Sequence, residues 1–396
     1  MRLLSFDGWR GILAALVVIS HFPGRTSMWG TRFDDNFAAV VDFFFILSGF
    51  VIVAAFEKPM REGYGLRRFL TERFGRIYPI HLFMLVLFVL TEFILSVLLQ
   101  RFMPSDRAPF SGIYSIHAIF TNLTLTHAWG LEDMTTWNYP SWSLSTEWAA
   151  YIFFAVAMLL PGRRFWPFAL VGVIGSALVL FFVAPRGMSS TEDYGVFRSL
   201  LGFSTGAFCF YLFRALKARG VLVGAGFLTL TVLELATLGL ALAAQLMLGL
   251  TPWAVFIPLA HAAFLLVLAY EGGAVAWLLS RRPLVYLGTI SLSVYVVHAW
   301  FVLRLLNGAK LLEKLTGAEL TEKLADPTGW SVQILKGPEW AMNLLAAGLL
   351  ALTIIVSHFT FRFIEKPGQA FFRRLAKRFV QEDAAMASPG AQVAKA

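Results

Sequence analysis

The sequence is poor in cysteine and poor in charge. Cys209 is the single cysteine among 396 residues, which excludes an intrachain disulfide and any zinc site built on several thiolates. Charged residues make up only 14% of the chain, whereas soluble globular proteins carry about a quarter. So little charge argues against an ordinary soluble domain and indicates that lipid is the solvent for most of the chain.

Hydrophobic residues take the place of the missing charge. They form 58% of the sequence, and the mean hydropathy is +0.69. A transmembrane helix needs roughly 20 mostly apolar residues, and ten such runs end at Gly, Pro or charged residues. We predict an all-α, polytopic integral membrane protein. Its spans cover residues 6–23, 38–56, 77–99, 143–160, 165–183, 197–213, 221–240, 253–270, 284–306 and 340–364.

The basic residues indicate an orientation in the bilayer rather than a nucleic-acid partner. The net charge is +9, but Lys and Arg gather in every second connection between the apolar runs, as the positive-inside rule requires. The clearest case is the connection between the second and third runs, with Lys58, Arg61, Arg67, Arg68, Arg73 and Arg76. We therefore predict that both termini are cytoplasmic. The first run lacks an A-x-A cleavage site, so we expect a retained span and not a signal peptide.

One membrane domain accounts for most of the chain. We assign residues 1–365 to this domain and residues 366–396 to a basic cytoplasmic tail, which begins as an amphipathic helix and becomes disordered. Two predicted outer connections, 100–142 and 307–339, are long enough to be functional loops. We find neither a second globular domain nor a convincing repeat.

Ionisable side chains inside the apolar runs are expensive to bury, so each is a candidate functional group. The predicted topology places four of them from four spans at one depth near the outer surface. They are His21, Asp42, Glu147 and His298. Arg10 and His21 are eleven residues apart, which leaves them about 20° apart around a helix and about 16 Å apart along it. Both therefore face the same side of the first span at different depths.

Polar side chains follow one face of two further spans. The fourth span carries them at i, i+4 and i+8, and the ninth carries a similar stripe. These residues are Ser143, Glu147 and Tyr151 in the fourth span and Ser291, Tyr295 and His298 in the ninth. We expect Ser143, Tyr151 and Tyr295 to contact the substrate.

A group of cations lies at the predicted cytoplasmic boundary. Arg73 and Arg76 open the third span at i and i+3, and Arg10 lies close to them in depth. Because a guanidinium fork suits phosphate oxygens, these three arginines are candidates for binding an anionic ligand. The two arginines of the third span would equally serve as snorkelling anchors of the topology.

The other candidates also have structural interpretations. Asp42 and Glu147 lie near helix N-termini, where the helix dipole stabilises a carboxylate without any catalytic role. His298 taken alone is more often a hydrogen-bonded packing residue than a catalytic one. His21 is harder to explain in this way, because it shares a helix face with Arg10.

Six motifs, in a fixed order, now resemble those of one family. They are FDGWRGILAALVVISH at 6–21, VDFFFILSGFVI at 41–52, RFGRIYPIH at 73–81, PSWSLSTEWAAY at 140–151, ISLSVYVVHAW at 290–300 and FRFIEKP at 361–367. The chain resembles the bacterial membrane acyltransferases known as acyltransferase family three over nearly its whole length. The order and number of the motifs make the resemblance specific, since any one alone would be weak.

The resemblance implies ten spans in the bacterial cytoplasmic (inner) membrane and an enzyme that uses no metal. It implies an acyl-CoA donor, commonly acetyl-CoA, that enters from the cytoplasm, and an acceptor hydroxyl on an extracytoplasmic or lipid-linked glycan. The family's Arg and His of the first span fall on Arg10 and His21, and its paired arginines fall on Arg73 and Arg76. Some members carry a further extracytoplasmic domain. Its absence here leaves open whether a separate extracytoplasmic partner completes the reaction.

Together these observations suggest a mechanism with His21 as general base, oriented by Asp42 or Glu147 while the arginines hold the CoA phosphates. A covalent acyl-histidine intermediate is a second possibility. A transporter or flippase that moves an anionic substrate past the same ionisable residues is the alternative function, although no inverted repeat supports it. A binding or scaffold protein would explain the spans but not the ionisable groups at one depth.

Overall fold

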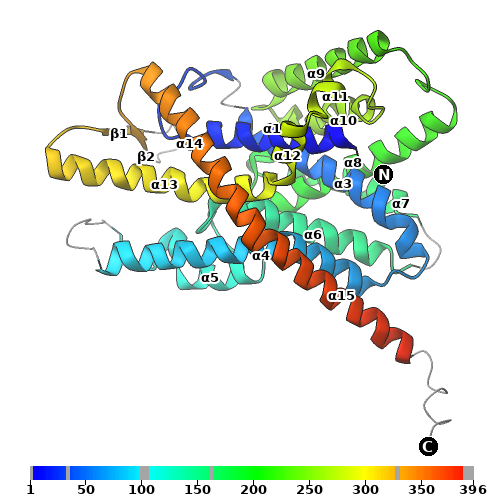
Figure 1. Ribbon diagram of the computed structural model, residues 1–396, viewed down its shortest axis with the longest axis horizontal. Coiled ribbons are helices and arrows are strands. Elements are labelled where there is room, and N and C mark those ends of the chain that lie inside the picture. Colours follow the sequence, from blue (N-terminus) through cyan, green and yellow to red (C-terminus); the bar gives the residue numbers. More distant parts are fainter. Residues whose placement is uncertain (1–2, 33–35, 99–106, 161–163, 326–330, 387–396) are drawn as a thin grey trace, which may run out of the picture.

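The computed structural model describes residues 3–32, 36–98, 107–160, 164–325 and 331–386. Helices dominate these residues and form a bundle (Figure 1). They are α1 (Leu4–Ser20), α3 (Val40–Arg61), α4 (Leu66–Phe93), α5 (Ile116–Leu123), α6 (Trp142–Ala157), α7 (Trp166–Phe182), α8 (Gly195–Ala218), α9 (Phe227–Leu248), α10 (Ile257–Leu268), α11 (Ala274–Leu279), α12 (Arg282–Thr289), α13 (Ser291–Thr316), α14 (Glu339–Thr360) and α15 (Lys366–Met386).

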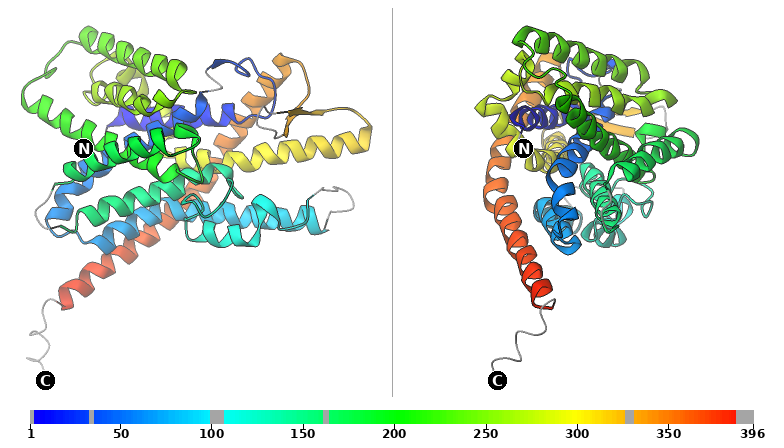
Figure 2. Two further views of the ribbon diagram at one scale, coloured as in Figure 1. Left: turned by 180° about the vertical axis from the view of Figure 1, so that it is seen from behind. Right: turned by 90° about the vertical axis from the view of Figure 1, so that its right-hand side faces the viewer.

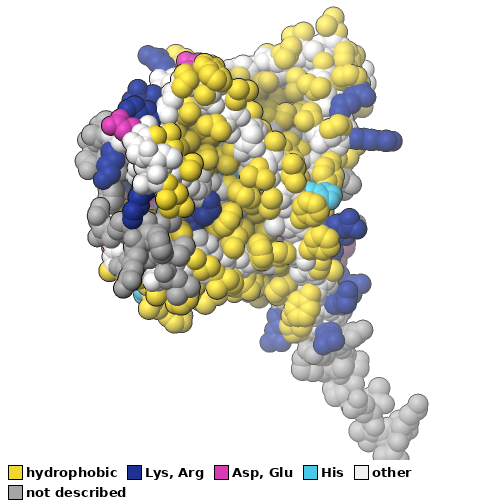
Figure 3. Space-filling view, turned by 60° about the vertical axis from the view of Figure 1, so that its left-hand side comes forward, with side chains coloured by type: hydrophobic (Ala, Val, Ile, Leu, Met, Phe, Trp, Pro, Cys, Tyr) yellow, Lys and Arg dark blue, Asp and Glu magenta, His cyan; other side chains and the backbone are white. Residues whose placement is uncertain are grey.

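Six helical segments of the described chain are long and apolar enough to cross a membrane. They are Phe37–Arg61, Leu66–Val97, Gly195–Ala218, Phe227–Leu248, Ser291–Thr316 and Glu339–Phe379. The helices at the other four predicted spans are shorter, with 17 residues in α1 and α7, 16 in α6 and 12 in α10. The structure is therefore that of a polytopic, mostly helical membrane protein. On the face in Figure 3, hydrophobic side chains cover the middle and Lys and Arg gather toward the margins.

Several predicted spans have different bounds in the structure, such as 77–99, whose helix α4 already begins at Leu66. The predicted span 221–240 becomes α9, which begins only at Phe227 because Gly220 and Gly224 take positive φ angles of 76° in the preceding turn. The predicted span 284–306 is divided at Ile290, which separates α12 from α13, and α13 then continues to Thr316. Gly317, with φ 72°, ends that helix.

A small sheet corrects the all-α prediction. Strands β1 (Thr321–Ala325) and β2 (Ser331–Leu335) pair antiparallel in the connection that was expected to be a loop, with Lys323 opposite Gln333. The Leu335 backbone N–H donates to the Pro23 carbonyl at 2.7 Å. The hairpin is thereby attached to the segment that follows α1, and so it lies close to the end of the helix that carries His21.

Glycines allow two central helices to approach closely. A Cβ on Gly49 of α3 would lie 1.8 Å from the Phe203 carbonyl oxygen of α8, and one on Gly206 of α8 would lie 1.9 Å from the Ile46 oxygen. Small residues of this kind permit close packing where lipid supplies no hydrophobic driving force between helices. The pair α3 and α8 therefore forms a rigid wall beside α1.

The last helices form one rod across the outside of the bundle (Figure 2). α14 continues through a π-helical turn (Phe361–Glu365) into α15, so the helix does not end at the predicted domain boundary after residue 365. α15 packs on α4, where a Cβ on Gly368 would lie 2.5 Å from the Pro79 ring. The start of α1 and the end of α15 lie at the same end of the bundle. Residues 387–396, which were predicted to be disordered, lie outside the described residues.

Candidate active site

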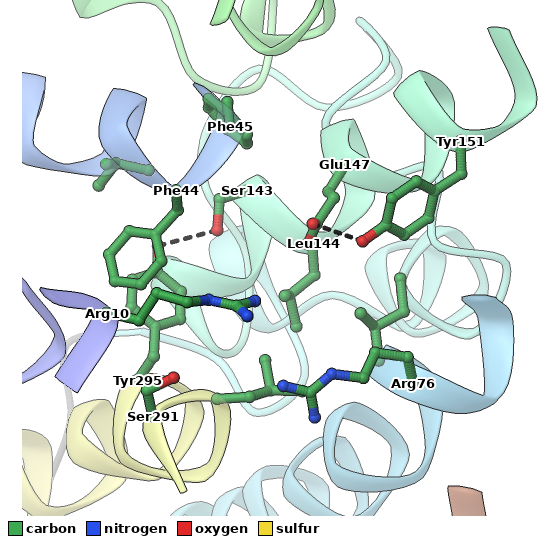
Figure 4. Close-up of a pocket in the computed structure, with 13 residues that line it drawn as sticks. Arg10, Phe44, Phe45, Arg76, Ser143, Leu144, Glu147, Tyr151, Ser291 and Tyr295 are labelled. Carbon is green, nitrogen blue, oxygen red and sulfur yellow. Dashed lines mark hydrogen bonds between the residues drawn. The ribbon is translucent and has the colours of Figure 1, made fainter. Parts of the chain in front are cut away.

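A cavity lies among α1, α3, α4, α6 and α13 (Figure 4). Its lining combines cationic, acidic, hydroxyl and apolar side chains. They are Arg10, Val41, Phe44, Phe45, Arg76, Ile77, Ser143, Leu144, Glu147, Tyr151, Ser291, Leu292 and Tyr295. Five of the six motifs contribute to this wall, although they are spread over almost 300 residues of sequence.

Two arginines enter the cavity from different helices. Arg10 comes from α1, and its buried Nε has no hydrogen-bond partner within the described chain. Arg76 comes from α4 and pairs with Glu365, which also accepts from Ser293 at 2.7 Å and from Gln369 at 2.9 Å. Arg76 is therefore held in position by a carboxylate, whereas Arg10 presents an unpaired donor (Figure 4).

The polar stripe of α6 forms one side of the cavity, as its helical spacing predicts. Glu147 accepts hydrogen bonds from Tyr151 at 2.6 Å and from Ser48 of α3 at 2.8 Å. Ser143 donates to the Tyr295 hydroxyl at 2.8 Å, and that hydroxyl donates in turn to the Pro140 carbonyl at 3.0 Å. These hydrogen bonds connect α6 with α3 and α13 and fix the orientation of the polar groups in the cavity.

A histidine pair adjoins the cavity at Tyr295. His21 follows the last residue of α1, and its Nδ1 lies 2.9 Å from the Val17 carbonyl and 3.2 Å from Nε2 of His298. The two rings stack with centroids 5.1 Å apart, and the Tyr295 ring lies 6.0 Å from His298. Since a carbonyl oxygen only accepts, the contact with Val17 favours a proton on Nδ1 of His21. Nε2 of neutral His21 then carries the free lone pair.

Tyr139 completes the surroundings of this pair and was not among the predicted residues. Its ring lies 5.1 Å from that of His21 and 6.2 Å from that of His298. It belongs to a 3₁₀ turn (Tyr139–Ser141) in front of α6, and burial raises its pKa. The phenol therefore remains neutral. Its position next to the PSWSLSTEW motif was the only signal in the sequence.

The structure does not bring either predicted orienting carboxylate to His21. Asp42 is buried and pairs with Arg198 of α8, with Oδ1 2.7 Å from Nε. The described hydrogen bonds of Glu147 go to Ser48 and Tyr151. The prediction rested on equal depth, but residues at one depth can lie on opposite sides of a bundle. Within the described residues, the groups at hydrogen-bond distance from the His21 ring are the Val17 carbonyl and Nε2 of His298.

Arg73 also lies apart from the cavity lining. Its guanidinium carbon sits 4.8 Å from the centroid of the Phe56 ring, and its buried Nε has no partner in the part of the chain that the structure describes. It is one helical turn before Arg76 on α4. Arg73 is thus positioned next to the cavity without forming its wall.

Sequence reasoning missed two charged residues that hold the site together, Arg198 and Glu365. Arg198 is 1% exposed and donates to Asp42 and to the carbonyl oxygens of Ala38 and Ser190. Glu365 is completely buried beside Arg76. Arg198 falls inside the predicted span 197–213, and Glu365 stands directly after the span 340–364. A complete list of ionisable residues in and beside the apolar runs would have included both.

No metal centre is evident within the described residues, since no group of three or more His, Cys, Asp and Glu side chains is arranged to hold an ion there. The donors that face the cavity are instead guanidinium and hydroxyl groups. Such groups suit phosphate and carbonyl oxygens better than they suit a metal ion.

The comparison with known families identifies this arrangement. The profile of a family described as an acyltransferase domain matches residues 3–365, which is nearly the whole chain. The chain belongs to this acyltransferase family. The resemblance seen in the motifs is thereby confirmed, and the helices long and apolar enough to cross a membrane support a membrane location.

Individual relatives align with this chain over stretches shorter than the family match. Acyltransferase MdmB of Streptomyces mycarofaciens is 30% identical over 158 residues, which are 38% of this chain and 37% of that protein. Protein 2 in picA locus of Rhizobium radiobacter is 33% identical over 158 residues, or 37% of this chain and 77% of that protein. An uncharacterized protein of Haemophilus influenzae is 27% identical over 36% of this chain and 57% of its own length. No solved structure matches.

Proposed function

We propose that this acyltransferase resides in the bacterial inner membrane and transfers an acyl group, commonly acetyl, from cytoplasmic acyl-CoA to a hydroxyl of an extracytoplasmic or lipid-linked glycan. One observation carries the proposal. A cavity with two inward-facing arginines, Arg10 and Arg76, adjoins the pair of His21 and His298 through the shared wall residue Tyr295. An anionic carrier and a proton-transferring group can therefore meet in one place.

The arginines supply the donor subsite. Arg76 is oriented by Glu365, and Arg10 offers an unpaired Nε–H, so both can direct N–H groups at CoA phosphates. Arg73, one turn earlier on α4, adds a further cation on the path of the donor. The CoA arm then extends past the hydroxyls of Ser143 and Tyr151 toward the histidines.

The histidines supply the chemistry. Nε2 of His21 accepts the proton of the acceptor hydroxyl as that oxygen attacks the thioester carbonyl. The C–S bond then breaks, the new ester forms, and the proton passes from His21 to the sulfur of departing CoA. His298 and Val17 orient His21. The hydroxyl of Tyr139, whose ring lies next to His21, donates a hydrogen bond to the negative charge that develops on the thioester carbonyl oxygen. A covalent acyl group on His21 is the alternative course of the same reaction.

The two carboxylates take different parts in this proposal. Glu147 lines the cavity and holds Tyr151 in place, so it acts on the donor arm or the acceptor. Asp42 lies outside the cavity lining and fixes α3 to α8 through Arg198. Neither carboxylate is needed to orient the imidazole of His21.

The topology belongs to the proposal as well. We propose ten spans with both termini in the cytoplasm, which would place Arg10 and Arg76 toward the donor and His21 toward the acceptor. Support comes from the basic connections and from the position of the start of α1 and the end of α15 at one end of the bundle. The Streptomyces relative is named an acyltransferase, which supports acyl transfer, and the alignment covers 37% of that protein.

The test uses the full chain purified into lipid nanodiscs with radiolabelled acetyl-CoA and a panel of saccharides. We expect release of free CoA thiol that depends on the saccharide, together with an alkali-labile radioactive ester on it. Substrate counterflow in proteoliposomes without release of CoA would instead favour the transporter. Absence of both ester and CoA release across the panel would contradict the proposed reaction.

A further inference from the structure

Arg304 of α13 is an incompletely paired cation. Its Nε and Nη1 are both buried and have no hydrogen-bond partner among the described residues. Its guanidinium carbon lies 5.7 Å from the Trp300 ring, and the Trp300 indole N–H donates to Thr91 Oγ1 of α4 at 3.0 Å. The packing of Trp300 against α4 thus positions Arg304, but it leaves two of the three guanidinium nitrogens unsatisfied.

The neighbouring carboxylate is already occupied. Glu92 accepts from Arg107 at 2.7 and 2.8 Å and from the Phe110 backbone N–H at 3.2 Å. Arg304 lies within electrostatic range of Glu92 and of Tyr114, whose ring is 4.7 Å from the guanidinium of Arg107. Among the described residues, two guanidinium groups here share one carboxylate. Buried guanidinium nitrogens without a partner are costly unless a ligand compensates them.

This charge lies beside the histidine pair. Arg304 follows His298 by six residues on the same helix, which is about 9 Å along the axis and about 120° around it. Trp137 packs edge-on against Tyr114 with centroids 5.3 Å apart, and Tyr139, two residues later, contacts both histidines. These aromatic contacts connect the surroundings of Arg304 with those of His21. Arg10 and Arg76 line the cavity, whereas Arg304 lies outside its lining. In the proposed topology α13 runs outward, so Arg304 lies further toward the acceptor side than His298.

We propose that Arg304 binds a carboxylate or phosphate group of the acceptor through its unsatisfied nitrogens. The planar fork of arginine matches the paired oxygens of both groups. This inference rests on the proposed function and deepens it, because it restricts the acceptor to acidic saccharides. The acid is either a sugar carboxylate or the phosphate of a linked or lipid-bound saccharide.

Binding is measured first, without any acyl transfer. Saturation-transfer NMR on the full chain in nanodiscs compares methyl glucuronide, glucose 1-phosphate and neutral methyl glucoside. We expect the wild type to bind at least one of the acidic sugars roughly tenfold more tightly than the neutral one, the size of effect typical of hydrogen bonds to a charged group. Which acid binds more tightly distinguishes a carboxylate acceptor from a phosphate acceptor.

Variants test the residue itself. Arg304→Gln should remove the preference for the acid, and Arg304→Lys should retain part of it. The matched control is Lys310→Gln, which removes one charge from an exposed position of the same helix and should change nothing. Because buried Nε and Nη1 of Arg304 have no hydrogen-bond partner among the described residues, Arg304→Gln should unfold at the same temperature as the wild type or higher. A purely structural arginine would give a lower unfolding temperature.

The outcomes separate the inference from the function on which it rests. Equal binding of acidic and neutral sugars by the wild type, or an unchanged preference in Arg304→Gln, overturns the inference. If the acid binds through Arg304 but no saccharide is acetylated from acetyl-CoA, the anion site stands and the proposed reaction fails. If neutral sugars are acetylated as well as acidic ones, the reaction stands and the inference fails.

Discussion

Two arginines in neighbouring parts of the bundle show opposite degrees of pairing. Arg198 lies in the wall formed by α3 and α8, where Asp42 and two carbonyl oxygens accept its hydrogen bonds and Trp142 covers it at 5.1 Å. Arg10 lies at the cavity, where its buried Nε has no partner in the described chain. A buried charge that is fully paired has a structural role, whereas one that is left unpaired is a candidate for ligand binding. Position along the span does not distinguish these two roles, whereas the number of hydrogen-bond partners does.

The largest expected effect is a loss of activity in His21→Gln, a variant of the active site beside the cavity. This variant retains hydrogen bonding but cannot serve as a base, so acyl transfer should fall about a hundredfold to ten-thousandfold. Acetyl-CoA binding and expression should stay near the wild-type level, because the arginine subsite is intact. Ester formation by purified protein is the measurement. Transfer at a near wild-type rate would move the assignment to His298.

The next largest effect is a loss of stability in variants of the Asp42–Arg198 ion pair between α3 and α8. Replacing Asp42 or Arg198 alone leaves its partner charged and buried, which typically costs about 3–5 kcal/mol. The double variant Asp42→Leu with Arg198→Met should recover most of that stability, because it removes both charges. Thermal unfolding in detergent measures each variant. An Asp42→Asn protein that is as stable as the wild type but inactive would return Asp42 to a catalytic role.

A smaller effect is expected for the donor arginines, and here the two should differ. Arg10→Gln should weaken acetyl-CoA binding roughly tenfold to hundredfold, since a hydrogen bond to a charged group contributes about 1.5–3 kcal/mol. Its unfolding temperature should not fall, because no protein partner is lost. Arg76→Gln should weaken binding and also lower stability, since Glu365 then loses its cation. Binding and unfolding curves on the same preparations separate the cases. Unchanged acetyl-CoA affinity in Arg10→Gln would show that its unpaired donor has no ligand.

The smallest effect on stability is expected for Asp193, a partly exposed carboxylate that is paired with Arg186. Partial burial favours the neutral form of Asp193, but hydrogen bonds from the Tyr194 backbone N–H and from Arg186 outweigh it and lower the pKa of Asp193. A lowered folded-state pKa stabilises the protein above the ordinary value of 3.8, and this contribution is lost as the pH falls through the folded-state pKa. Asp193→Asn should therefore cost no more than about 1 kcal/mol at neutral pH. Unfolding curves from pH 7 to pH 3 should converge, and a gap that widens toward low pH would contradict the assignment.

The helices of this protein were readable from sequence, since lipid requires long apolar runs whose backbone hydrogen bonds are satisfied internally. The alternation of basic connections predicts an orientation for the spans, and periodicity placed Ser143, Glu147 and Tyr151 on one face of α6. Such features are local, because each depends on residues within one helix.

Pairing between helices was decided only by the tertiary structure. Depth can be calculated along a single span, but which side of the bundle a span occupies depends on how all the helices pack. Asp42 therefore pairs with Arg198 and does not contact His21. Arg76 pairs with Glu365, nearly 300 residues later in the chain. The contact between His21 and His298 joins the first motif to the fifth in the same way. No local pattern specifies these partners, because a helix presents several faces and only close packing, such as that of Gly49 against α8, selects which faces meet.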